Sequence, residues 1–164
     1  MDLNAFSMED LLLSALKAET ESREAYNKLA QAVKNALLKD RLKFLSAEEE
    51  KHRGFFETLY QQRFQGKEIV LPEKSPVPLP EIKIEDEKLR ISEIFWSAMQ
   101  AETAAHDFYQ SLAEQFTEDP QVKKMLLYIA TMEMGHYKLL EIEKENAEKF
   151  EAYDVEWPMM HIGA

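Results

Sequence analysis

Several residue types are scarce or missing from this chain of 164 residues. It has no cysteine, which excludes disulfides, thiolate-bound zinc, iron–sulfur clusters and catalysis by a thiol. It has only four glycines, and most of its six prolines fall in one segment, so long helices are expected rather than a sheet-rich fold. No apolar run approaches the ~18 residues that a membrane-spanning helix needs.

Basic residues are fewer than acidic ones, since the chain has 20 lysines and arginines but 31 aspartates and glutamates. The net charge of −11 argues against nucleic acid or an anionic membrane as a partner, because either would be repelled. The N-terminal stretch MDLNAFSMED lacks the charged-then-apolar order of a signal peptide. A cytoplasmic protein is therefore expected.

The residues that are present predict an all-α fold. With 45% hydrophobic residues, the chain is long enough for one domain with a substantial core. Apolar residues recur at helical spacing in four segments, and helix-capping residues precede them, among them Ser7, Asn35 and Asp119. The predicted helices span about residues 7–34, 35–65, 89–117 and 119–150.

The segment between the second and third helices, residues 66–88, has prolines at 72, 76, 78 and 80 and is predicted to be extended. At ~3.1 Å per residue it can reach about 60–70 Å, whereas a helix of roughly 28 residues is only ~42 Å long. It can therefore recross a whole bundle, or pass the second hairpin to a neighbouring chain. We predict a four-helix bundle over residues 1–150, and an apolar tail, residues 151–164, that packs on the bundle or a partner.

The two predicted hairpins are copies of one another. The stretch ALKAETESREAYNKLAQ from Ala15 matches AMQAETAAHDFYQSLAE from Ala98, and KFLSAEEEKHRGFFE from Lys43 matches LYIATMEMGHYKLLE from Leu127. Ala-Glu-Thr, a later tyrosine and Glu-x-x-His recur at equivalent positions. The repeat thus places the same polar residues in each hairpin.

Ionisable residues interrupt the apolar stripe that each helix is expected to bury. The stripes advance in alternating three- and four-residue steps, typical of a bundle interior. Glutamate interrupts every stripe, and histidine follows one turn later in the second and fourth helices. Counting from the two hairpin turns brings all six residues to one height in the bundle. They are Glu19, Glu49, His52, Glu102, Glu133 and His136.

Four carboxylates in an apolar interior would repel one another, and each unpaired ion costs several kcal/mol of desolvation. No lysine or arginine lies on the stripes to neutralise them. Two divalent cations would balance the charge, and an oxygen-rich set with one imidazole per metal suits iron or manganese better than structural zinc. We therefore predict a site for two metal ions, which would be iron, manganese or a mixed pair. A polar network that only fixes helix register is the structural alternative.

With these motifs, the chain resembles the ferritin-like di-iron carboxylate proteins, and the rubrerythrin group in particular, over about residues 8–150. The resemblance implies a ferritin-like bundle of two antiparallel hairpins joined by a long crossover. It also implies that Glu49 and Glu133 bridge the irons, that Glu19 and Glu102 are terminal ligands, and that each histidine binds one iron.

The chain departs from typical rubrerythrins in two ways. They carry a C-terminal rubredoxin domain with four cysteines, whereas this chain has none, so electrons would come from a separate protein. They also carry a further glutamate, one turn after the third-helix ligand, that exchanges with a histidine when the redox state changes. Ala105 stands at that position and Ser22 at its counterpart in the first repeat, which weakens a peroxide-reducing assignment.

Other polar residues have less specific expectations. Tyr26 and Tyr109 lie on the same stripes, two turns beyond the first- and third-helix glutamates, and we expect packing or a hydrogen bond near the metals rather than redox chemistry. His106 is expected to flank the site rather than bind metal, and its repeat counterpart Arg23 to pair with a nearby carboxylate. His161, in the tail, has no assigned role.

These features predict a di-iron oxidoreductase of peroxidase or ferroxidase type. It would oxidise Fe(II), or reduce hydrogen peroxide or dioxygen with electrons from an external donor protein. An iron-binding module without turnover and a purely structural bundle are the alternatives, and hydroxylation of an organic substrate also fits the scaffold. A homodimer is expected, with hairpin exchange through residues 66–88 as one form.

Overall fold

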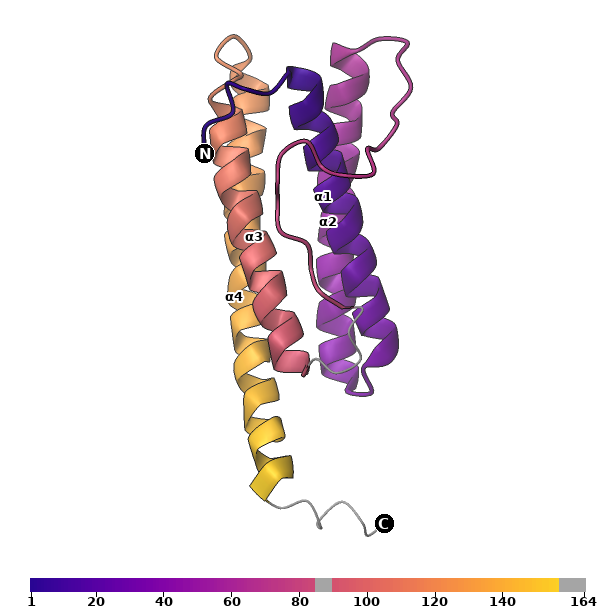
Figure 1. Cartoon of the computed structure of the whole chain (residues 1–164), viewed down its shortest axis with the longest axis vertical. Coiled ribbons are helices and arrows are strands. Elements are labelled where there is room, and N and C mark those ends of the chain that lie inside the picture. Colours follow the sequence, from indigo (N-terminus) through magenta and orange to yellow (C-terminus); the bar gives the residue numbers. More distant parts are fainter. Residues whose placement is uncertain (85–89, 157–164) are drawn as a thin grey trace.

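The computed structural model describes residues 1–84 and 90–156, with side chains up to residue 151. It contains α1 (Met8–Ala32), α2 (Ala36–Arg63), α3 (Ile91–Ala113) and α4 (Pro120–Glu156). α1 packs along α2 and α3 along α4, which gives two antiparallel hairpins side by side (Figure 1). The predicted all-α bundle of two hairpins is confirmed.

Short polar side chains begin the helices as the sequence predicts. Ser7 Oγ accepts a hydrogen bond from the Asp10 N–H (3.1 Å), and the Asp10 carboxylate accepts one from the Ser7 N–H (3.2 Å). Asn35 Oδ1 accepts from Leu38 N–H (3.0 Å), directly after the turn between α1 and α2. These bonds satisfy N–H groups that have no partner within a helix, and so fix where the helices begin.

Two helix ends differ from the prediction. The third helix was expected to reach Thr117 but ends at Ala113, because the Gln115 and Phe116 N–H groups bond to carbonyls three residues back and tighten the chain into a turn. Phe116 is still buried there.

The fourth helix continues past Phe150 to Glu156. Glu151 accepts hydrogen bonds from the N–H (3.1 Å) and the hydroxyl (2.6 Å) of Ser92, which fastens this part of α4 to the start of α3. The first residues of the expected tail are therefore helical. Residues 157–164, with His161, lie outside the described part of the chain, so the packing of the tail stays a prediction.

The crossover between α2 and α3 is extended where it is described, and in Figure 1 it crosses α1 and then runs along the gap between α1 and α3. Val77 is fully buried, and its N–H donates to Ser14 Oγ (3.1 Å) on α1. The crossover therefore covers one side of the bundle and connects the hairpins within one chain. Hairpin exchange between chains stays a prediction.

Two apolar clusters fill the interior, and each draws on all four helices. The first contains Leu12, Phe56, Phe108 and Leu126, and the second contains Leu29, Leu42, Phe95 and Leu140. The predicted glutamates and histidines lie between these clusters along the helices. Among the described residues, no helix is long and apolar enough to cross a membrane.

Candidate metal centre

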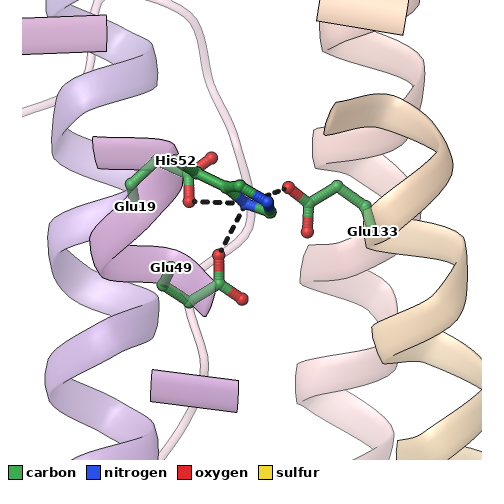
Figure 2. Close-up of side chains that lie close together, drawn as sticks. All are labelled: Glu19, Glu49, His52 and Glu133. Atoms are coloured by element: carbon green, nitrogen blue, oxygen red, sulfur yellow. Dashed lines mark ion pairs between the residues drawn. The ribbon is translucent and has the colours of Figure 1, made fainter. Parts of the chain in front are cut away.

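The six predicted residues lie together in the middle of the bundle. Glu19 and Glu102 come from α1 and α3, while α2 and α4 each supply a glutamate and, one turn later, a histidine on the same face. None of the six is more than 5% exposed. Figure 2 shows Glu19, Glu49, His52 and Glu133 pointing toward one another from three different helices.

The six residues form two overlapping groups, each with four ligand atoms within 4.8 Å of one another. One group is Glu19, Glu49, His52 and Glu133, and the other is Glu49, Glu102, Glu133 and His136. Glu49 and Glu133 belong to both groups, which is the arrangement expected if two metal ions share two carboxylates. The structure thus gathers all six predicted ligands, while their coordination of metal stays a prediction.

Each histidine turns Nδ1 toward several carboxylate oxygens. His52 Nδ1 lies 3.0 Å from Glu133 Oε1, 3.3 Å from Glu49 Oε2 and 3.5 Å from Glu19 Oε2 (Figure 2). His136 Nδ1 lies 3.0 Å from Glu49 Oε1 and 3.1 Å from Glu133 Oε2. Because a ring nitrogen carries at most one proton, it cannot serve all of these acceptors by hydrogen bonding. A cation between them would bind the nitrogen and the oxygens together.

Several of these buried atoms have no hydrogen-bond partner, namely Glu19 Oε2, Glu49 Oε1, Glu133 Oε1 and His52 Nδ1. A buried polar atom without a partner costs about 1–3 kcal/mol, and more when it is charged. Metal coordination would satisfy these atoms at once. The donor set, mainly carboxylate oxygen with one nitrogen per group, therefore fits a pair of iron or manganese ions.

Without metal, the site holds protons strongly. Burial, and next the charge of Glu49, raises the pKa of Glu19 to about 8. Burial, and next the charge of Glu19, raises the pKa of Glu133 to about 7. For His52, burial favours the neutral ring, but the surrounding carboxylates of Glu133, Glu19 and Glu49 outweigh it and raise the pKa to about 12. For Glu102, burial also opposes the charged form, but the nearby His136 ring, whose Nδ1 lies 3.7 Å from Glu102 Oε2, prevails and lowers the pKa of Glu102.

These shifts predict how the metal-free protein responds to pH. Glu19, Glu133 and His52 bind protons more tightly in the folded chain than in the unfolded chain, so their contribution to stability is lost as the pH rises through the folded pKa values. We expect the melting temperature of the metal-free protein to fall steadily between about pH 5 and pH 9. Thermal unfolding followed by circular dichroism would measure this, and a melting temperature that rises over that range would contradict it. Bound metal should flatten the profile, because ligands bind metal only after losing their protons.

The two buried tyrosines connect the hairpins. The Tyr26 hydroxyl on α1 donates to Glu102 on α3, and the Tyr109 hydroxyl on α3 donates to Glu19 on α1. Burial, and next the charge of the accepting glutamate, raises the pKa of both tyrosines well above the ordinary value, so both stay protonated donors. Each tyrosine therefore orients a glutamate of the opposite repeat, and the expectation of a hydrogen bond near the site is confirmed.

A pocket reaches the site between α1, α3 and the crossover. Its inner wall is formed by the four glutamates, and its outer wall includes Ser22, Ala105, Ser75, Leu79 and Ile82. Because Ser22 and Ala105 are small, the space one turn beyond Glu19 and Glu102 is open to a small molecule.

The remaining polar residues of interest lie beside the site. His106 Nδ1 lies 2.7 Å from the Ala130 carbonyl oxygen, and His106 belongs to neither of the two carboxylate–histidine groups. Arg23 pairs with Glu50 (2.7 Å), the carboxylate next to Glu49 in the sequence, so the predicted nearby ion pair is present.

Two features of the structure were not predicted from the sequence. Buried Glu143 on α4 forms an ion pair with Arg41 on α2, and it could have been anticipated because it follows Leu140 on the same stripe. The role of the crossover as one wall of the pocket had no such signal, since an extended segment has no helical period that marks its inward side.

A bundle of two helical hairpins with overlapping carboxylate–histidine groups between two apolar clusters defines a class, the ferritin-like bundles, and the buried groups are consistent with a site for a pair of metal ions. Within this class the chain belongs to the Rubrerythrin family, which it matches over residues 10–144, and its 164 residues include no cysteine. It is similar to the structure of a hypothetical protein from Pyrococcus furiosus, with 38% sequence identity and a TM-score of 0.80, over 91% of this chain and 95% of that one. Comparison with curated proteins gave no match.

Proposed function

We propose that this protein binds two iron ions in the middle of the bundle and carries out redox chemistry with them. The reaction would be oxidation of Fe(II), or reduction of hydrogen peroxide or dioxygen with electrons from a separate donor protein. The observation that carries the proposal is the pair of buried groups that share Glu49 and Glu133 and contain unpartnered donor atoms. Membership of the Rubrerythrin family favours iron over other divalent metals. Bound iron would supply the one-electron steps for which the chain, lacking cysteine, has no thiol.

The protein's own contribution is charge balance, geometry and exclusion of water. Four glutamates offset the charge of two divalent ions, and Tyr26 and Tyr109 hold Glu102 and Glu19 in place. The apolar clusters on either side keep water from the site along the bundle axis. A small oxidant would enter through the pocket beside Ala105.

Iron binding without turnover is the second candidate. Ala105 has no carboxylate to offer as an exchanging ligand, and it lines the pocket at the point where such a group would reach the site. A site with a fixed ligand set suits retention of iron at least as well as repeated change of oxidation state.

An anaerobic Fe(II) titration followed by hydrogen peroxide, monitored by near-ultraviolet absorbance, would test both candidates. We expect saturation near two irons per chain and then rapid growth of the absorbance of ferric iron held by carboxylates. With a reductant present, consumption of many equivalents of peroxide per iron would support the enzyme. If the bound iron is oxidised only once, the result would support iron binding without turnover. Absence of Fe(II) binding would contradict both.

A further inference from the structure

The crossover between α2 and α3 presents a hydroxyl to the pocket that leads to the metal centre. Ser75 lines this pocket, and the four glutamates of the metal centre form its inner end. Ser75 Oγ is buried and has no hydrogen-bond partner in the described part of the chain. Because most buried polar groups in folded proteins have a partner, an isolated one calls for an explanation. A molecule bound in the pocket would provide that partner.

The crossover is fixed against α1 directly after Ser75. Val77 is fully buried, and its N–H donates to Ser14 Oγ (3.1 Å). Leu79 packs against the first apolar cluster, whereas Pro78 is exposed. Alternate residues of an extended segment point to the same side. Ser75 therefore shares the inward side of the crossover, which runs along the gap between α1 and α3 (Figure 1).

Pro76 restricts the backbone of Ser75. A residue that precedes proline is largely confined to extended conformations, because the proline ring would clash with it in the helical region. Prolines at positions 76, 78 and 80 also fix their own φ angles and stiffen the segment. The hydroxyl is thus held in place before a ligand binds, and a preorganised group loses less entropy on binding than a mobile one.

The other polar groups of the pocket make a hydroxyl useful there. The described residues that line it include six glutamates and no lysine or arginine. An ionised carboxylate only accepts hydrogen bonds, so it cannot donate one to a ligand. Ser75 and Ser22 are the two hydroxyls of this lining. Of these two, only Ser75 Oγ is a buried atom without a partner.

The pocket limits its ligand to a few atoms. Its volume is about 30 Å³, whereas a single water molecule needs ~10–15 Å³. A molecule of two or three non-hydrogen atoms therefore fits. On the α3 wall Ala105 adds only a methyl group, so the space one turn beyond Glu102 remains open to such a molecule. The crossover, rather than α3, offers the polar contact.

We propose that Ser75 is a substrate-binding residue, whose hydroxyl donates a hydrogen bond to a small oxidant lodged between the crossover and the four glutamates. The bond orients the oxidant toward the metal centre. This inference rests on the function proposed above. It assigns a binding role to the crossover, which lies outside the four helices that supply the predicted metal ligands.

Azide is the probe for this contact, because it is a three-atom anion that binds ferric iron, changes its visible absorbance and accepts hydrogen bonds. We expect azide to bind the ferric form of the natural protein, and Ser75→Ala to weaken this binding about tenfold, since a hydrogen bond to a charged group is lost. Ser75→Thr keeps the hydroxyl and should stay within about threefold of the natural affinity. The amount of bound iron should be the same in all variants.

Ser111→Ala is the matched control. The Ser111 hydroxyl accepts from the N-terminal amino group (3.1 Å) and donates to the Asp107 carbonyl oxygen (2.8 Å), and Ser111 is not among the residues that line the pocket. Its removal should leave the affinity for azide unchanged.

An unchanged affinity for azide in Ser75→Ala would overturn the proposal. An equal loss in Ser75→Thr would overturn it too, because the loss would then come from displacement of the crossover rather than from the hydroxyl. A natural protein that binds iron but no azide would overturn this inference and leave the proposed function standing. Failure to bind iron at all would contradict the proposed function, and this inference with it.

Oxidation of the Fe(II)-loaded protein, followed by stopped-flow absorbance, shows which oxidant uses the hydroxyl. A slower reaction of Ser75→Ala with hydrogen peroxide alone would assign the bond to peroxide, and a slower reaction with dioxygen alone would assign it to dioxygen. Slower reactions with both would show that both oxidants use it. Unchanged rates with both oxidants would overturn the proposal.

Discussion

Replacing both Glu49 and Glu133 with glutamine should abolish binding of both iron ions. These two glutamates belong to both buried groups, so the double change removes two donors and two negative charges from each prospective metal position. Removing a residue that only hydrogen-bonds to a metal ligand already lowers metal affinity by about 10–100-fold. Removing two shared ligands should therefore lower the affinity for iron by more than about 100-fold. Anaerobic Fe(II) titration with separation of free iron would measure the change.

The adjacent Glu50 provides the control for this variant. Glu50 lies beside Glu49 in α2 but pairs with Arg23 and Arg53 away from the site, so Glu50→Gln should keep two irons per chain. The metal-free double variant should be as stable as the natural protein or more stable, because it loses two buried carboxylates that repel their neighbours. Retention of two tightly held irons by the double variant would contradict the ligand assignment and favour a network that only fixes helix register.

Loading the natural protein with Fe(II) should raise its melting temperature by about 15 °C or more. A ligand present at 1,000 times its dissociation constant stabilises the folded state by about 4 kcal/mol, and two sites would contribute about 8 kcal/mol. For a domain of this size, 1 kcal/mol corresponds to about 2–4 °C. The effect has a clear structural origin, because the ligands come from all four helices and bound ions would tie the two hairpins together.

Anaerobic scanning calorimetry with and without Fe(II) would measure this shift, and a chelator should reverse it. The Glu49→Gln/Glu133→Gln variant is the control and should not respond to Fe(II). An equal shift in that variant would indicate that iron binds elsewhere, for example among the surface carboxylates.

The helices and the residues of the candidate site follow largely from local features of the sequence. Ser7, Asn35 and Asp119 cap helices through hydrogen bonds over three residues, which makes the helix starts predictable. The helix ends were predicted less accurately than the starts. α3 stops in a tight turn after Ala113, and α4 continues past Phe150, where Glu151 bonds to Ser92. The ends thus depend on packing that short-range rules do not contain.

The side-chain hydrogen bonds between the two hairpins could be identified only from the tertiary structure. The sequence predicted only packing or a hydrogen bond near the site for the two tyrosines, and the structure pairs Tyr26 with Glu102 and Tyr109 with Glu19, across the two repeats. The pairing depends on how the hairpins are placed relative to one another. Spacing along a single helix carries no information on that placement.

By itself, the sequence determined four helices, two copies of a hairpin, and six ionisable residues at one height in the interior, because helical period and capping act over a few residues. The tertiary structure decided which oxygens surround each histidine, which tyrosine holds which glutamate, and where the crossover leaves a pocket. It also decided which apolar residues of α4 stay outside. These outcomes depend on the positions of segments distant in the chain, and those positions are set by the packing of the whole core.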